Sequence, residues 1–182
     1  MTTEELYDKL KLIQKMKCET QNLELKSAEQ GYPKRLYDSL SSFSNQDDGG
    51  IIVFGIDEKQ DYKEVGVYDA QDIQKKINEQ CLQMNPVVRP LITVVEKENK
   101  KFVSAEIPGI DMADRPCYYQ GRGRLKGSYT RIGDSDEPMT EYEIYSYEAY
   151  RRKYQDDIRE VPRVTLMSLD QEELNRYVGD YD

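Results

Sequence analysis

Apolar residues near the start of the chain recur every three or four positions, which is the spacing of one face of a helix. The residues with this spacing are Leu6, Leu10 and Ile13. Thr2 and Glu5 supply the Thr-x-x-Glu pattern that caps a helix N-terminus. We therefore predict a first helix over about residues 3–16.

Polar and apolar residues then alternate strictly over residues 22–26. Successive side chains of a strand point to opposite faces, so this pattern predicts a half-buried strand. Its two leucines should face a core, while Asn22, Glu24 and Lys26 share the other face.

A second helix is expected from Tyr32, because Pro33 suits a first helical turn and an apolar stripe follows. The stripe consists of Leu36, Leu40 and Phe43. A polar turn over Asn45–Gly50 ends this helix and leads into the continuous apolar run 51–56. Such a run is typical of a strand buried on both faces in the middle of a sheet.

The rest of the chain continues to mix strands with helices. A short strand is expected at 64–67, a helix at 69–84, and a hairpin of strands at 91–96 and 101–107. The stretch 115–138 should contain a strand, a Gly/Arg loop and a second strand at 128–132. A helix with a Thr140/Glu143 capping box should run from 140 to about 154, and a short helix should follow at 170–178. Together they predict an α+β or mixed α/β fold, a central and mostly antiparallel sheet with helices packed on it.

The length of 182 residues suits one domain. We place it at residues 1–154. Residues 155–182 are expected to be a linker or the start of a following region, because residues 156–169 show little periodicity. We therefore expect further domains C-terminal to this chain in a longer protein.

The sequence contains no histidine, which excludes Ser-His-Asp hydrolysis, HExxH chemistry and His-ligated zinc. Cys18, Cys81 and Cys117 are widely spaced and form no CxxC pair, as expected of reduced thiols. No apolar run approaches the length of a membrane span, and the N-terminus lacks the apolar stretch of a signal peptide. We expect a cytoplasmic protein with no membrane contact.

The net charge of −9 argues against unspecific coating of nucleic acid, but one stretch reverses the sign. Residues 115–133 hold five cations and no acid, interleaved with tyrosines. The cations are Arg115, Arg122, Arg124, Lys126 and Arg131, and the tyrosines are Tyr118, Tyr119 and Tyr129. Arginines bind phosphates and tyrosines can stack on bases, so this stretch predicts a nucleic-acid contact, with Lys26 as an auxiliary. The alternative is a solvated hairpin whose arginines pair with surface acids.

Four carboxylates are candidates for catalysis, namely Glu19, Glu24, Asp57 and Glu58. Asp57 and Glu58 end the expected central strand, where open sheets present functional groups. Converging carboxylates could hold Mg²⁺ or Mn²⁺ and assist phosphodiester cleavage. The alternative is that Glu24 faces water, and Glu19 can join it only if the chain bends between them.

The glycine-bearing turn at Asn45–Gly50 is a poor phosphate cradle. A P-loop runs from strand to helix, so that a helix N-terminus meets the phosphate. Here a helix ends instead, and its C-terminal end repels anions. The sequence favours a helix stop followed by a tight turn.

Taken together, the motifs resemble the Schlafen AlbA_2 domain, also called the divergent AAA-4 domain. This domain stands at the front of many bacterial proteins described as transcriptional regulators. The matching segments are Glu19–Lys26, Ser42–Asn45 with Gly49 and Gly50, Ile52–Glu58, and Arg115–Pro138.

The resemblance implies an α/β fold and nucleic-acid binding. In the Schlafen branch it also implies a metal-dependent endoribonuclease site with three carboxylates. Glu19 and Glu24 match the first two acids, and the third is Asp57 or Glu58. The implied metal ligands are Glu19, Glu24 and Glu58.

Three hypotheses follow. The leading one is a nucleic-acid-binding module of a bacterial transcriptional regulator, with DNA favoured over RNA and a homodimer expected. The second is a metal-dependent endoribonuclease that uses the carboxylates. The third, based on the acidic charge and the tyrosine-rich helix Tyr142–Tyr154, is a non-catalytic dimerisation module.

Overall fold

The computed structural model describes residues 1–168. Its helices are α1 (Thr3–Met16), α2 (Tyr37–Ser44), α3 (Ala70–Leu82), α4 (Gly123–Gly127) and α5 (Glu141–Ser168), with 3-10 turns η1 (Glu58–Gln60) and η2 (Met112–Asp114). Its strands are β1 (Leu23–Lys26), β2 (Gly50–Phe54), β3 (Ile56–Asp57), β4 (Lys63–Glu64), β5 (Met84–Asn85), β6 (Leu91–Lys97), β7 (Lys100–Ile107), β8 (Tyr118–Tyr119), β9 (Tyr129–Ile132) and β10 (Ser135–Pro138).

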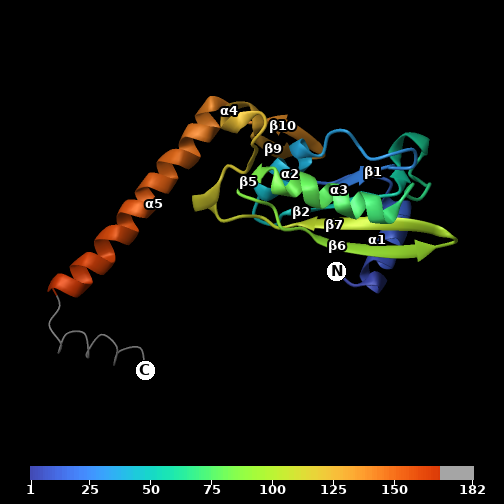
Figure 1. Ribbon diagram of the computed structural model, residues 1–182, viewed down its shortest axis with the longest axis horizontal. Helices are drawn as coiled ribbons and strands as arrows, with labels where there is room; N and C mark the ends of the chain where they lie inside the picture. Colours follow the sequence, from blue (N-terminus) through green and yellow to red (C-terminus); the bar gives the residue numbers. More distant parts are fainter. Residues whose placement is uncertain (169–182) are drawn as a thin grey trace, which may run out of the picture.

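A four-stranded sheet in the order β1-β2-β7-β6 forms the centre of the molecule (Figure 1). β1 runs parallel to β2, and the other two pairings are antiparallel. The ribbon β9-β10 lies beside this sheet, next to α2. The expected α+β architecture is therefore confirmed, and β2 occupies the central position that its apolar run predicts.

The sheet is covered by helices on both faces, and each face has its own core. On one face α2 and α3 pack against side chains such as Ile52 and Phe54 of β2. On the other, α1 packs against Leu23, Leu25 and Val53. Because alternate residues of β2 enter different cores, the strand has to be apolar throughout.

Glycines at two positions let the turn after α2 lie against the segment that follows β7. Gly49 has a φ of +62°, and a Cβ there would lie 2.0 Å from the carbonyl oxygen of Ile107. A Cβ at Gly109 would lie 2.1 Å from the carbonyl oxygen of Gln46. This turn is a packing junction at the end of a helix, in agreement with the sequence pattern.

Several elements differ from the sequence-based expectation. α2 begins at Tyr37 instead of Tyr32. Tyr32 lies outside the helix, and its hydroxyl donates to Gln80 of α3 at 2.7 Å. The Gly/Arg loop contains the short helix α4, and β10 was not expected.

The last helix, α5, continues well beyond the predicted end at Tyr154. It projects away from the body of the molecule (Figure 1), so its distal part lacks the apolar periodicity of a helix packed on a core, which is the pattern that the prediction used. The helix expected at 170–178 lies outside the described residues. Within residues 1–168, no helix combines the length and the apolar character needed to cross a membrane.

Candidate nucleic-acid interface

Arg131 of β9 is the centre of a buried cluster of charges. Its Nη1 donates to Glu24 at 2.7 Å and to Asp136 at 2.9 Å. Its Nη2 donates to the carbonyl oxygens of Thr20 at 3.1 Å and Leu23 at 2.9 Å. The side chain has no exposed surface, so this guanidinium binds β1 to the β9-β10 ribbon.

α2 completes the cluster from the other side. Ser39 and Ser42 donate to the carboxylate of Asp136 at 2.8 and 2.5 Å. The ring of Phe43 lies 4.9 Å from the Arg131 guanidinium carbon, a cation–π distance. The cluster therefore joins three elements that are far apart in the sequence.

This burial corrects three of the predicted nucleic-acid contacts. Arg131 is only 5% exposed and is committed to internal partners. Arg115 is 6% exposed and donates to Asp47 at 2.7 Å and to the carbonyl oxygen of Ile110 at 3.0 Å. Tyr129 is 6% exposed, so its ring offers no face to a base. These three side chains point into the protein, where they stabilise the fold of 115–133 and are not available to a nucleic acid.

The other cations of the same stretch lie on the surface. Arg122, Arg124 and Lys126, called here the α4 cations, stand on α4 and the residue before it, and all three are exposed. Arg122 donates to the hydroxyl of Tyr129 at 3.0 Å, and Arg124 pairs with Glu148 of α5. Among residues 1–158, whose side chains the structure describes, Lys126 and Arg122 have no carboxylate at ion-pair distance. The α4 cations thus form a short basic surface, and the buried Tyr129 holds one of them, Arg122, by a hydrogen bond.

Half-buried tyrosines adjoin this surface. Tyr118 lies 6.0 Å from the guanidinium carbon of Arg124. Tyr119 stacks on Tyr37 of α2, with ring centroids 3.7 Å apart. Lys26, in contrast, lies 3.2 Å from a carboxylate oxygen of Glu24 and is partly buried, so it belongs to the charge cluster.

The four predicted catalytic carboxylates have different surroundings. Glu24 is 9% exposed, so the alternative in which it faces water is wrong, and its two oxygens pair with Arg131 and Lys26. Asp57 caps η1 by accepting from the backbone of Lys59 at 3.0 Å. Glu58 is exposed.

Of the four carboxylates, Glu19 has the most strongly perturbed pKa, which is a common property of functional carboxyl groups. It accepts a hydrogen bond from the backbone of Leu25 at 2.8 Å. Burial, together with the charges of Glu24 and Glu58, raises its pKa to about 7. Glu24 and Glu58 are therefore near enough to act electrostatically on Glu19.

These residues do not fit a divalent metal in the arrangement that the structure shows. Both oxygens of Glu24 are already neutralised by cations, and hard metals need unpaired carboxylate oxygens. Within residues 1–168, no three acids or thiols are grouped so that they could hold a metal ion. We derive no metal-dependent step from this geometry.

Several residues of the cluster carried only weak signals in the sequence. Asp136 looks like one surface acid among many, and Ser39 and Ser42 interrupt an apolar stripe without an evident partner. Asn45 fits the pattern of a helix stop, yet its amide donates to the carbonyl oxygens of Cys117 and Tyr129, both at 3.0 Å. Polar residues on the buried side of α2 were the available hint that polar partners lie opposite.

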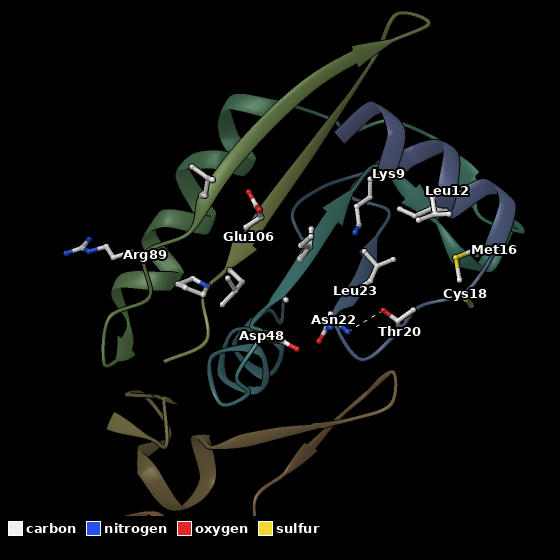
Figure 2. A pocket seen from close by; sticks show the side chains of 16 residues that line it. Lys9, Leu12, Met16, Cys18, Thr20, Asn22, Leu23, Asp48, Arg89 and Glu106 are labelled. Carbon is white, nitrogen blue, oxygen red and sulfur yellow. Dashed lines mark hydrogen bonds between the residues drawn. The ribbon is translucent and has the colours of Figure 1, made fainter. Parts of the chain in front are cut away.

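A separate groove of about 660 Å³ lies between α1 and the sheet (Figure 2). Figure 2 shows Lys9, Leu12 and Met16 along α1 on one side of it. Leu23 lies in its wall, and Glu24, the next residue of the same strand, points to the other face. The groove and the charge cluster are therefore on opposite faces of the sheet.

The family model described as "Schlafen, AlbA_2" matches residues 19–140, a range that includes the charge cluster and the α4 cations. No curated protein matches the chain.

The solved structures that are similar include the following two. One is the N-terminal domain of a protein from Nitrosomonas europaea described as related to the ATP-dependent DNA helicase RecG, solved by NMR in solution. It is 25% identical with a TM-score of 0.56, over 77% of this chain and 94% of that one. The other is the DIP2311 protein of Corynebacterium diphtheriae, 18% identical with a TM-score of 0.48, over 70% of this chain and 24% of that one.

Proposed function

Since the chain belongs to the Schlafen AlbA_2 family, we propose that it is a nucleic-acid-binding module of a bacterial transcriptional regulator, with DNA as the expected partner. The observation that carries this proposal is the exposure of the α4 cations. Three cations stand within five residues on a chain whose net charge is −9. Such a local reversal of sign attracts phosphates to one place and repels them elsewhere.

The α4 cations supply the chemistry that phosphate binding requires. Guanidinium groups donate paired N–H bonds to phosphate oxygens, and a lysine adds a mobile point charge. Arg122 is held by the hydroxyl of Tyr129, which reduces the side-chain entropy lost on binding. Tyr118, beside Arg124, offers an aromatic surface next to the phosphate contacts.

The buried cluster supports this role indirectly. Arg131 fixes the β9-β10 ribbon against β1 and α2, and Tyr129 of the same ribbon contacts Arg122. The position of the basic surface therefore depends on the cluster. The structural likeness to a domain from a protein described as related to a DNA helicase is consistent with a nucleic-acid partner.

A pair of matched variants tests the proposal. Arg122→Gln with Lys126→Gln should weaken binding to a fluorescent 20-mer by roughly a hundredfold or more, because each of the two lost charged contacts is worth about 1.5–3 kcal/mol. Lys59→Gln with Lys63→Gln removes the same charge from exposed lysines of η1 and β4 and should leave binding nearly unchanged.

Fluorescence anisotropy with single-stranded DNA, duplex DNA and RNA of one sequence provides the measurement. Tighter binding of DNA than RNA would support the DNA assignment. Equal losses in the two double variants would show that the surface around α4 has no special part in binding, and the proposal would fail.

A further inference from the structure

The groove beside α1 is lined, on its sheet side, by one residue from each strand of the central sheet. Ile51 of β2 lies opposite both Leu23 of β1 and Glu106 of β7, and Glu106 lies opposite Leu91 of β6. Residues opposite each other in a sheet point to the same face, so these four side chains form one row across the sheet. The row spans three strand spacings, which is about 14 Å.

The N-terminal segment covers the next row of the sheet and leaves this one open. The next row consists of Leu25, Val53, Ser104 and Thr93. Its first two residues lie in the core under α1, and the hydroxyl of Thr93 donates to the carbonyl oxygen of Met1 at 2.9 Å. The open row instead borders the groove of about 660 Å³, and its Leu91 is 58% exposed.

The side of the groove formed by α1 is apolar as well. Leu12 and Met16 line it and are 48% and 53% exposed. Together with Leu91 they place three large apolar side chains in contact with water around one hollow. Exposed apolar groups gathered around a concave surface are typical of a binding site.

Lys9 of α1 brings a positive charge to this apolar surface. Its side chain is half-buried and extends from the helix over the sheet toward Leu23 (Figure 2). Over the residues with described side chains, 1–158, no carboxylate lies at ion-pair distance from its ammonium group. The Lys9 charge is therefore available to a ligand in the groove.

The other charged groups of the groove do not cancel the charge of Lys9. Glu106 forms an ion pair with the amino group of Met1, which compensates its negative charge. Asp48 and Arg89 are both exposed, so water and salt screen them, and Arg89 points away from the groove in Figure 2.

These features indicate the chemistry of the occupant. The groove volume falls within the range of small-molecule sites, about 300–1,000 Å³. A row about 14 Å long is short for a protein partner, whose interface usually buries roughly 800 Å² on each side. The row accepts an apolar body, and Lys9 attracts an anionic group, more strongly beside apolar surface than it would in bulk water.

We propose that the groove binds a small amphiphilic carboxylate, a molecule with an apolar chain and one anionic end. The chain lies along the row between Leu23 and Leu91, and the carboxylate accepts a hydrogen bond from the ammonium group of Lys9. This site lies on the face of the sheet opposite the charge cluster. It does not rest on the proposed function, since it requires no nucleic acid.

Two probes with the same chain and opposite head charges test the role of Lys9. Calorimetric titration of the full chain should show decanoate binding at least tenfold more tightly than decyltrimethylammonium, each below its critical micelle concentration. Lys9→Gln should weaken decanoate binding by roughly tenfold or more. Lys15→Gln removes an exposed lysine of the same helix that does not line the groove, and it should leave both affinities unchanged.

A second set of measurements tests the place of binding. Leu91→Asn makes the row polar at an exposed position and should weaken both probes, while circular dichroism confirms that each variant is folded. In methyl NMR spectra, decanoate should shift the resonance of Met16 and leave that of Met84, which is buried in the core on the other face of the sheet.

Four results would overturn the proposal. They are no binding of decanoate at millimolar concentration, equal affinity for the two head groups, decanoate affinity unchanged by Lys9→Gln, and a shift at Met84 without one at Met16. A dimer in light scattering that Leu91→Asn dissociates would overturn it too, because a second copy of the chain would then cover the groove.

Discussion

At the scale of single residues, Arg131 and Glu24 decide how the domain is held together. Arg131 satisfies two carboxylates and two carbonyl oxygens, and its side chain is fully buried. Losing one partner of such a pair typically costs about 3–5 kcal/mol, because the other charge stays buried without compensation. Both residues are therefore expected to tolerate no change of charge.

Glu19 gives a prediction on pH. Its pKa is raised from an ordinary 4.5 to about 7, so the folded protein keeps a proton that the unfolded chain releases. The stability that this proton supplies is present below pH 4.5 and is lost as the pH rises through 7. Glu19→Gln stays neutral and can still accept from Leu25.

We therefore expect Glu19→Gln to gain stability relative to the wild type as the pH rises from about 5.5 to about 8. The gain should be on the order of 1 kcal/mol, after allowing for solvent screening of a partly exposed group. Urea unfolding at the two pH values measures it. A difference that does not vary with pH would show that Glu19 titrates normally.

Residue type in the sequence predicted which stretch is basic but not which of its cations face solvent. Arg124 and Arg131 are seven residues apart in the same run, and one is exposed while the other is buried. The difference arises because β9 directs Arg131 toward Glu24, which lies in a distant strand, and toward Asp136 of β10. A contact across more than a hundred residues of chain leaves no local pattern.

At the scale of elements, the spacing of apolar residues predicted the helices and strands that bury an apolar face in the core. The helix at 3–16, the buried central strand and the hairpin of β6 and β7 all follow from apolar spacing, and all are confirmed. The boundaries of α2 and α5 were wrong, because they depend on what lies against the helix. The β9-β10 ribbon depends most on such outside contacts, since Arg131 is its main link to β1.

Arg131→Met should therefore release this ribbon. The variant keeps the bulk of the side chain but leaves Glu24 and Asp136 without their common cation. We expect amide exchange in β9 and β10 to accelerate by about 10²-fold or more, in line with a loss of about 3–5 kcal/mol, while β2 and β7 stay protected.

Hydrogen exchange followed by mass spectrometry measures this loss. Arg122→Met, which removes an exposed arginine with the same change of bulk, should leave the ribbon protected. If the two variants exchange alike, Arg131 is not the link between the ribbon and the sheet.

At the scale of the whole molecule, an acidic domain carries a short basic surface at the α4 cations. A net charge of −9 repels phosphates over most of the protein, and we therefore propose the α4 cations as the place where a nucleic acid approaches.

The salt dependence of binding tests the central claim most directly. If Arg122, Arg124 and Lys126 each neutralise a phosphate of duplex DNA, the logarithm of the binding constant should fall against the logarithm of salt with a slope of about −2.7. Arg122→Gln with Lys126→Gln should reduce the slope to about −1. A slope near zero for the wild type, or the same slope for both proteins, would contradict binding through the α4 cations.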